Sequence, residues 1–147
     1  MRIIALDVGE RRIGVAFGDT ALQVAIPAAV IERQGTEADW QAVVREAGAR
    51  EAELIVAGMP FSLNGRRGPQ AEATEDFIHR LREYTGIPIE TWDERFSTSE
   101  AEHRMRTARP ASKRGKAGRS PRGAVDAAAA AIILQSYLDA LPKGPAT

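Results

Sequence analysis

Acidic residues at three places, far apart in the sequence, are of the kind that metal-dependent hydrolases use. Asp7 follows one apolar run, the pair Asp93 and Glu94 follows another, and Asp126 begins an alanine-rich stretch. Carboxylate oxygens without histidine or cysteine are the ligands that Mg²⁺ or Mn²⁺ prefers. Two such ions, about 3.5–4 Å apart, activate a water and stabilise the leaving oxygen in phosphodiester hydrolysis. If the fold brings these acids together, phosphodiester chemistry is the expected use.

Each of these acids also has an ordinary structural interpretation. Asp7 could cap a turn, Asp93 could form an Asx-turn, and Asp126 could favour a helix N-terminus. Buried isolated acids are costly, however, and close like charges raise one another's pKa unless a cation neutralises them. A metal site explains all three at once, because a core strand is a rigid mount for a ligand.

The hydrophobic pattern predicts the elements that would position these acids. Apolar runs predict strands over residues 2–7, 12–18, 24–31, 53–57 and 87–92. Helical spacing and caps predict helices over residues 36–50, 70–85 and 123–141, and a further one that begins at the capping box 97–100. Pro27 places the third strand near an edge or at a bulge. Hairpin strands followed by alternating strands and helices imply a mixed sheet covered by helices.

In such a sheet the acids would meet at one edge. Ligands bind beyond the carboxyl ends of parallel strands. Asp7 ends the first strand, Asp93 and Glu94 end the last strand, and Asp126 lies in the first turn of the final helix. By contrast, Asp39 in the helix over 36–50 is expected to be exposed and to take no part.

Length and composition predict one cytoplasmic domain over residues 1–141, followed by a short tail over 142–147. The chain has 147 residues, 44% hydrophobic and 27% charged, which is ordinary for a globular protein. It has no cysteine, which excludes disulfides, thiolate nucleophiles and zinc ribbons. No apolar run approaches the roughly 18 residues of a membrane span, and the start reaches Asp7 too soon for a signal peptide.

The charge is unevenly distributed, although the net charge is zero. The chain has 20 basic and 20 acidic residues, but the segment 104–122 has eight basic residues and no acid. The remainder therefore has 12 basic and 20 acidic residues, a net charge of about −8. The segment, which also contains glycine, serine and proline, is predicted to form a mobile loop over 107–123. It is either a solvated loop or a binding segment for an anionic polymer.

Four motifs, in this order along the chain, resemble those of the YqgF/RuvX family. They occupy residues 7–16, 58–65, 93–98 and 125–126, the last followed by alanines. The resemblance covers the chain from Met1 to about Leu138. It implies an RNase H-like α/β fold similar to RuvC-type resolvases, with a mixed sheet that has a three-strand antiparallel portion and parallel strands, flanked by helices.

The resemblance also implies a function. It indicates a divalent-metal-dependent nuclease that hydrolyses phosphodiester bonds and processes the 5′ end of pre-16S ribosomal RNA. The alternative within the family is a Holliday-junction-resolving or other DNA-processing nuclease. The expected partners are structured RNA or branched DNA, with no membrane, and the expected state is a monomer or weak homodimer.

Carried over by position, the resemblance makes Asp7, Glu94 and Asp126 the catalytic acids and the ligands of Mg²⁺ or Mn²⁺, with two ions expected. Asp93 is an alternative ligand or a supporting partner, and the sequence does not decide between it and Glu94. Related folds often carry an acid at the end of the fourth strand, where this chain has Gly58. Relatives often also have two lysines before the last acid, where this chain has Arg122 and Ala124.

Basic side chains near these acids are the predicted contacts to nucleic acid. Arg95 could pair with Asp93 or contact the scissile phosphate, and the second is favoured. Arg11 and Arg12 could bind the backbone or be exposed hairpin charges. The loop 64–68 is expected to face the same edge as the acids. The predicted contacts are Arg11, Arg12, Arg66, Arg67, Arg95, Lys113, Arg114, Lys116, Arg119 and Arg122.

Two rival classes fit the sequence less well. Sugar kinases and actin-like ATPases also begin with a strand, an acid, a glycine and a second strand, but they need two such domains and a longer chain. A non-catalytic nucleic-acid-binding module would gain by losing negative charge at its contact face. The acids at 7, 94 and 126 argue against such a module.

Overall fold

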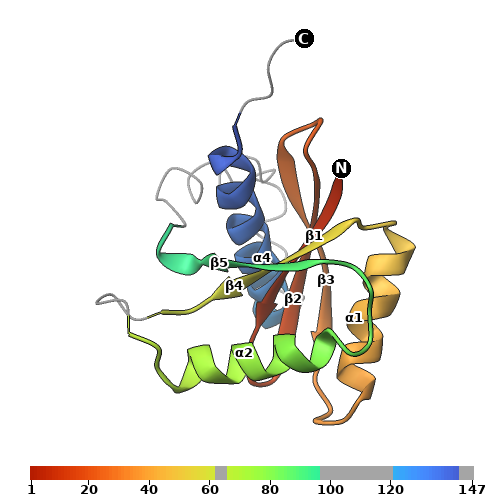
Figure 1. Ribbon diagram of the computed structural model, residues 1–147, viewed down its shortest axis with the longest axis vertical. Coiled ribbons are helices and arrows are strands. Elements are labelled where there is room, and N and C mark those ends of the chain that lie inside the picture. The colour runs from red at the N-terminus through yellow and green to blue at the C-terminus, as the bar shows by residue number, and fades with distance from the viewer. Residues whose placement is uncertain (62–65, 97–120, 143–147) are drawn as a thin grey trace.

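The computed structural model describes residues 1–61, 66–96 and 121–142, and within these ranges the side chains of all but residues 96 and 121–124. Five strands form one mixed sheet in the order β3-β2-β1-β4-β5 (Figure 1). Antiparallel pairing joins β1 (Arg2–Val8), β2 (Arg12–Asp19) and β3 (Val24–Glu32). Parallel pairing adds β4 (Leu54–Met59) to β1 and then β5 (Ile89–Asp93) to β4. The predicted mixed sheet is confirmed.

Helices cover both faces of this sheet, as predicted. On one face, α4 (Pro121–Ala140) shares a core with β1, β2 and β4. On the other face lie α1 (Ala38–Ala49) and α2 (Pro69–Leu81). A 3₁₀ turn, η1 (Glu94–Phe96), follows β5 directly. Across the described ranges, none of these helices is both long and apolar enough to cross a membrane.

Side chains of β1 alternate between the two cores, because successive strand residues point to opposite faces. Ile3 and Ala5 pack in the core beneath α4, whereas Ile4 and Leu6 pack in the core beneath α1 and α2. Asp7 is next in the first set, so its side chain belongs to the α4 side of the sheet. Apolar burial on both faces makes β1 a rigid mount for this carboxylate.

The last helix begins earlier than predicted, at Pro121 rather than Gly123. Proline is favoured in the first turn of a helix because its missing N–H has no partner there anyway. Asp126 therefore lies in the second turn, which corrects its predicted place in the first. The helix dipole acts mainly within the first turn, so this position weakens the N-terminal interpretation of Asp126. The helix predicted from 97–100 and nearly all of the loop predicted over 107–123 lie outside the described residues.

The edge position predicted for the strand that contains Pro27 is confirmed. β3 is an edge strand, and its pairing with β2 is irregular between Val15 and Ala16, the residue that pairs with Pro27. Proline cannot donate a ladder hydrogen bond, so it is tolerated at edges and bulges.

Asp39 is buried rather than exposed, which corrects the prediction. Its side chain is 1% exposed and accepts hydrogen bonds from the backbone N–H groups of Gln34 (2.8 Å) and Gly35 (3.1 Å). Arg33 pairs with the same carboxylate, with Nε 3.5 Å from Oδ2, and donates from Nη1 to the carbonyl of Gly9 at 2.8 Å. The side chain of Asp39 points back to the preceding loop and accepts hydrogen bonds from backbone N–H groups that would otherwise lack partners. It thereby connects α1 to the β1–β2 turn.

Candidate active site

Asp7 is half-buried near the carboxyl end of β1, directly opposite Gly14 of β2. A Cβ added at Gly14 would lie 1.9 Å from the carbonyl oxygen of Asp126. Glycine at this position therefore lets the beginning of α4 lie against β2, and the contact brings Asp126 to the region of Asp7. Burial, and then the charge of Asp126, raises the pKa of Asp7 to about 6.

Glu94 reaches the same side of the sheet from β5. Trp92 of β5 packs in the core under α4, and its indole N–H donates to Ser136 Oγ at 3.0 Å. Glu94 follows two residues later in η1, whereas Asp93 lies between them and belongs to the opposite face.

The carboxylate of Glu94 lies against the end of β4. A Cβ added at Gly58 would be 3.1 Å from Glu94 Oε2 and 3.2 Å from its Cγ. Burial, then the charges of Asp7 and Asp93, raises the pKa of Glu94 to about 7. A carboxylate that is this costly to ionise, with another buried acid close enough to disfavour its charge, is typical of a functional site.

Asp93 pairs with Arg95 instead. Arg95 donates from Nε to Asp93 Oδ1 (3.1 Å) and Oδ2 (3.0 Å), from Nη2 to Oδ2 (2.5 Å), and from its backbone N–H to Oδ1 (2.9 Å). These hydrogen bonds hold the pKa of Asp93 below its ordinary value. The Arg95 guanidinium also lies 5.7 Å from the ring centroid of Phe61. The structure thus shows Arg95 paired with Asp93, the first of its two predicted roles. It also favours Glu94 over Asp93 as the neighbour of Asp7.

Asp126 makes an ion pair with Arg12, the first residue of β2. The Nε of Arg12 donates to Asp126 Oδ2 at 2.6 Å, and the two side chains are 22% and 26% exposed. No three histidine, aspartate or glutamate side chains in the described part of the chain are placed to hold a metal ion as they stand. Asp126 is instead paired with Arg12, a cation that the protein itself supplies.

The donor set nevertheless suits a hard divalent cation. Asp7 and Glu94 offer carboxylate oxygens, and both have raised pKa values because burial and like charge disfavour their ionised forms. A cation bound between like charges would relieve that cost. Asp7, Glu94 and Asp126 therefore fit Mg²⁺ or Mn²⁺ by their chemistry.

The structure describes only some of the other predicted nucleic-acid contacts. Arg67 pairs with Glu75 of α2 and lines a cavity on the α2 side together with Phe61 and His79. The structure therefore does not bring Arg67 to the acids, because an ion pair with α2 holds it on the other face. Arg66 is exposed. Lys113, Arg114, Lys116 and Arg119 lie outside the described residues, and only the backbone of Arg122, in the first turn of α4, is described.

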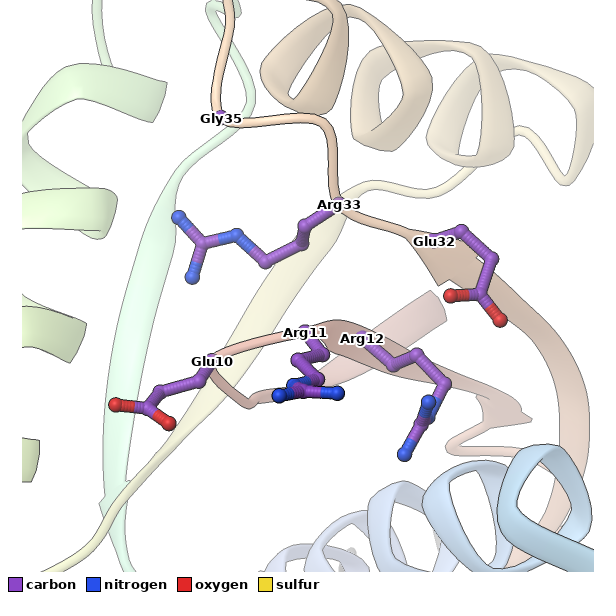
Figure 2. Close-up of a pocket in the computed structure, with 6 residues that line it drawn as sticks. All are labelled: Glu10, Arg11, Arg12, Glu32, Arg33 and Gly35. Atoms are coloured by element: carbon purple, nitrogen blue, oxygen red, sulfur yellow. The ribbon is translucent and has the colours of Figure 1, made fainter.

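An open cavity of about 450 Å³ lies beside the β1–β2 turn (Figure 2). In this view, the side chains of Arg11 and Arg12 extend to the side on which α4 lies, while Arg33 points away from them. The cavity is lined by Glu10, Arg11, Arg12, Glu32, Arg33 and Gly35. No motif in the sequence marked Arg33 as part of this region, because its contacts with Gly9 and Phe77 join segments that are far apart in the chain.

Comparisons with known proteins agree with these observations. The family model described as "RuvX: Holliday junction resolvase" matches residues 1–140. A relative from Halothermothrix orenii is 42% identical over 139 residues, covering 95% of this chain and 95% of the relative. Another from Anaeromyxobacter sp. (strain Fw109-5) is 40% identical over 139 residues, covering 95% of this chain and 97% of the relative. Both carry the name "Putative pre-16S rRNA nuclease".

Solved structures show the fold. RuvC of T. thermophilus, in complex with a Holliday junction substrate, aligns with a TM-score of 0.59 at 14% identity over 95% of each chain. The fowlpox virus resolvase, in complex with Holliday junction DNA, aligns with a TM-score of 0.58 at 13% identity, covering 97% of this chain and 100% of that chain. The fold is thus that of RuvC-like resolvases, and with the match over residues 1–140 the chain belongs to the RuvX family.

Proposed function

We propose that this protein is a divalent-metal-dependent nuclease that processes the 5′ end of pre-16S ribosomal RNA. The observation that carries the proposal is the proximity of Asp7 and Glu94, two half-buried carboxylates at one sheet edge whose pKa values are raised. The names of the relatives that share nearly the whole chain support the substrate. Ribosomal RNA precursors as substrate also imply a cytoplasmic location.

Asp7, Glu94 and Asp126 are the residues that would hold Mg²⁺ or Mn²⁺. When bound, two such ions supply an activated water and stabilise the leaving oxygen of the phosphodiester. Asp7 supplies a fixed ligand because β1 is buried on both faces. Glu94 is held by the Asp93–Arg95 pair, which fixes the first residues of η1. Arg12, which contacts Asp126, and its neighbour Arg11 would position the nucleic-acid backbone.

The test is a cleavage assay on RNA that contains the 5′ leader of pre-16S, with Mg²⁺, Mn²⁺ or EDTA. Asp7→Asn is expected to abolish cleavage, since it is nearly isosteric and removes a charge that the metal needs. Binding of the RNA and circular dichroism should be retained. Asp76→Asn is the matched control, because Asp76 lies on α2, on the opposite face of the sheet. Activity of Asp7→Asn within a few-fold of wild type would contradict the metal-site assignment.

Resolution of four-way DNA junctions is the second candidate function. The fold shared with two solved resolvases and the description of the family favour it. The same assay distinguishes the two when it includes a four-way junction of matched length. Cleavage of the junction at a higher rate than the RNA would favour the DNA substrate.

A further inference from the structure

Arg12 forms an ion pair with Asp126, one of the three proposed metal ligands. Its Nε donates to Asp126 Oδ2 at 2.6 Å, and no other ion pair of Arg12 with a described residue accompanies this contact. Both side chains are about a quarter exposed. The pair is partly buried, and its short hydrogen bond holds Asp126 to Arg12 in the metal-free protein.

A divalent cation and Arg12 compete for Asp126. A carboxylate that binds Mg²⁺ or Mn²⁺ gains more from a compact double charge than from one delocalised guanidinium, and the two cations repel each other. Asp126 is brought to the region of Asp7 by the packing of α4 on Gly14, and its charge acts on Asp7, so a cation bound at Asp7 would also attract Asp126. Arg12 would then lose its carboxylate.

The displaced guanidinium remains beside the cavity that it already lines. Arg33, on the other side of that cavity, is fixed by Asp39, by the carbonyl of Gly9 and by the ring of Phe77, whose centroid is 5.0 Å away. These contacts keep Arg33 in place when Arg12 changes its partner. Arg11 is exposed, and its side chain makes no hydrogen bond or ion pair with the residues that the structure describes. An anion that enters the cavity would meet the fixed Arg33, the exposed Arg11 and the released Arg12, in a lining that also contains Glu10 and Glu32.

We propose that Arg12 exchanges partners, so that it neutralises Asp126 in the metal-free protein and binds a phosphate of the nucleic acid once a divalent cation is bound. This inference rests on the proposed function, since it requires both ligands. It couples the two binding events, because the cation releases the phosphate-binding group. Coupling of this kind is reciprocal, so nucleic acid must raise cation affinity by the same factor by which the cation raises nucleic-acid affinity.

The direct test observes the Arg12 side chain by NMR. The Nε–H resonance of Arg12 in ¹⁵N-labelled protein is assigned by its disappearance in Arg12→Lys. In the metal-free protein the hydrogen bond to Asp126 is expected to protect this proton from exchange with water. Addition of Mg²⁺ is expected to shift the resonance and remove the protection. A resonance that stays in place while calorimetry shows Mg²⁺ binding would overturn the exchange and leave the proposed function standing.

The second test compares two neighbouring substitutions that change the net charge equally. Calorimetry with Mn²⁺ should give Arg12→Met a dissociation constant lower than that of Arg11→Met by about fivefold, because only Arg12 competes for Asp126. Equal constants for the two variants would contradict the proposal. Absence of any Mn²⁺ binding by the wild type, together with absence of cleavage, would instead contradict the proposed function.

The third test measures the salt dependence of RNA binding by fluorescence anisotropy, with Mg²⁺ or EDTA, and checks the RNA for cleavage afterwards. Each neutralised phosphate contributes about 0.7–0.9 to the slope of log affinity against log salt. Arg11→Met should lower the slope by about one such phosphate in both buffers. Arg12→Met should lower it only with Mg²⁺. An equal decrease in EDTA would show that Arg12 binds phosphate without any exchange.

Discussion

Glu94 places its carboxylate where a side chain at position 58 would otherwise lie. A Cβ at Gly58 would be 3.1 Å from Glu94 Oε2, although Gly58 belongs to β4 and Glu94 follows the neighbouring strand, β5. An acid at the end of β4 would point to this same place. The glycine thus makes room for an acid delivered from the next strand, beside Asp7 of β1.

Gly58→Ala is therefore expected to lower nuclease activity at least tenfold while the protein still folds. The added Cβ displaces Glu94 and would also lie 2.5 Å from Ile133 Cδ1, whose terminal methyl group can move. Overpacking of this kind costs about 1–3 kcal/mol of the free energy of unfolding. Urea denaturation and the cleavage assay measure the two effects.

Gly48→Ala is the matched control for this substitution. Gly48 lies in α1, and a Cβ there would meet nothing within 4 Å. Alanine is a better helix former, so the control should gain about 0.5–1 kcal/mol of stability and keep full activity. Full activity in Gly58→Ala would show that the position of Glu94 does not matter for cleavage.

The metal-free protein should become less stable as the pH rises from about 4 to 7. The folded-state pKa values of Asp7 and Glu94 are about 6 and about 7, above their ordinary values of 3.8 and 4.5. Over this interval the native state binds more protons than the unfolded state, so the free energy of unfolding falls with rising pH. Melting temperatures in EDTA at pH 5 and pH 8 measure the effect.

The double variant Asp7→Asn/Glu94→Gln serves as the reference for this pH effect, because it lacks both titrating groups. Its melting temperature should vary less between pH 5 and pH 8 than that of the wild type. Asp93, whose pKa is lowered, acts in the opposite sense, but only around and below its ordinary value of 3.8. Saturating Mg²⁺ at pH 8 should restore stability to the wild type alone. If the melting temperatures of the two proteins changed equally with pH, the titration of Asp7 and Glu94 would not affect stability.

Asp39→Asn is expected to destabilise the protein by about 1–3 kcal/mol, because a buried acceptor of several hydrogen bonds loses its charge. The side chain is 1% exposed and holds Gln34, Gly35 and Arg33. Chemical denaturation of this variant against the control Asp76→Asn measures the decrease in stability. Equal midpoints for the two variants would mean that the loop before α1 does not depend on this carboxylate.

The basic segment 104–122 yields a prediction from charge alone. Replacement of Lys113, Arg114 and Lys116 by alanine should weaken binding to all nucleic-acid sequences alike. The slope of log affinity against log salt should fall by about 0.7–0.9 for each phosphate that these side chains neutralise in the wild type. Residual cleavage at saturating substrate should survive, since the acids remain. Unchanged affinity and slope would show that these residues are only solvated.

Much of the fold could be predicted from the sequence, because the governing patterns act within a few residues. Alternating or continuous apolar runs marked the strands, and Pro27 marked an edge. Predictions that depended on the direction in which a side chain turns were less successful. Asp39 turns back to the N–H groups of Gln34 and Gly35, and Arg67 pairs with Glu75, eight positions later, away from the acids. Local spacing permits these pairs but does not distinguish them from exposed charges.

By itself, the sequence determined which acids could take part, namely Asp7, Asp93, Glu94 and Asp126, since their types and their positions at element ends are local properties. Only the tertiary structure decided their partners. At the end of β5, Asp93 pairs with Arg95, whereas the carboxylate of Glu94 lies over Gly58. The packing of α4 on Gly14 brings Asp126 to Arg12, 114 positions away in the chain. Such pairs arise because packing of distant elements, and not residue type, sets which charges lie within contact distance.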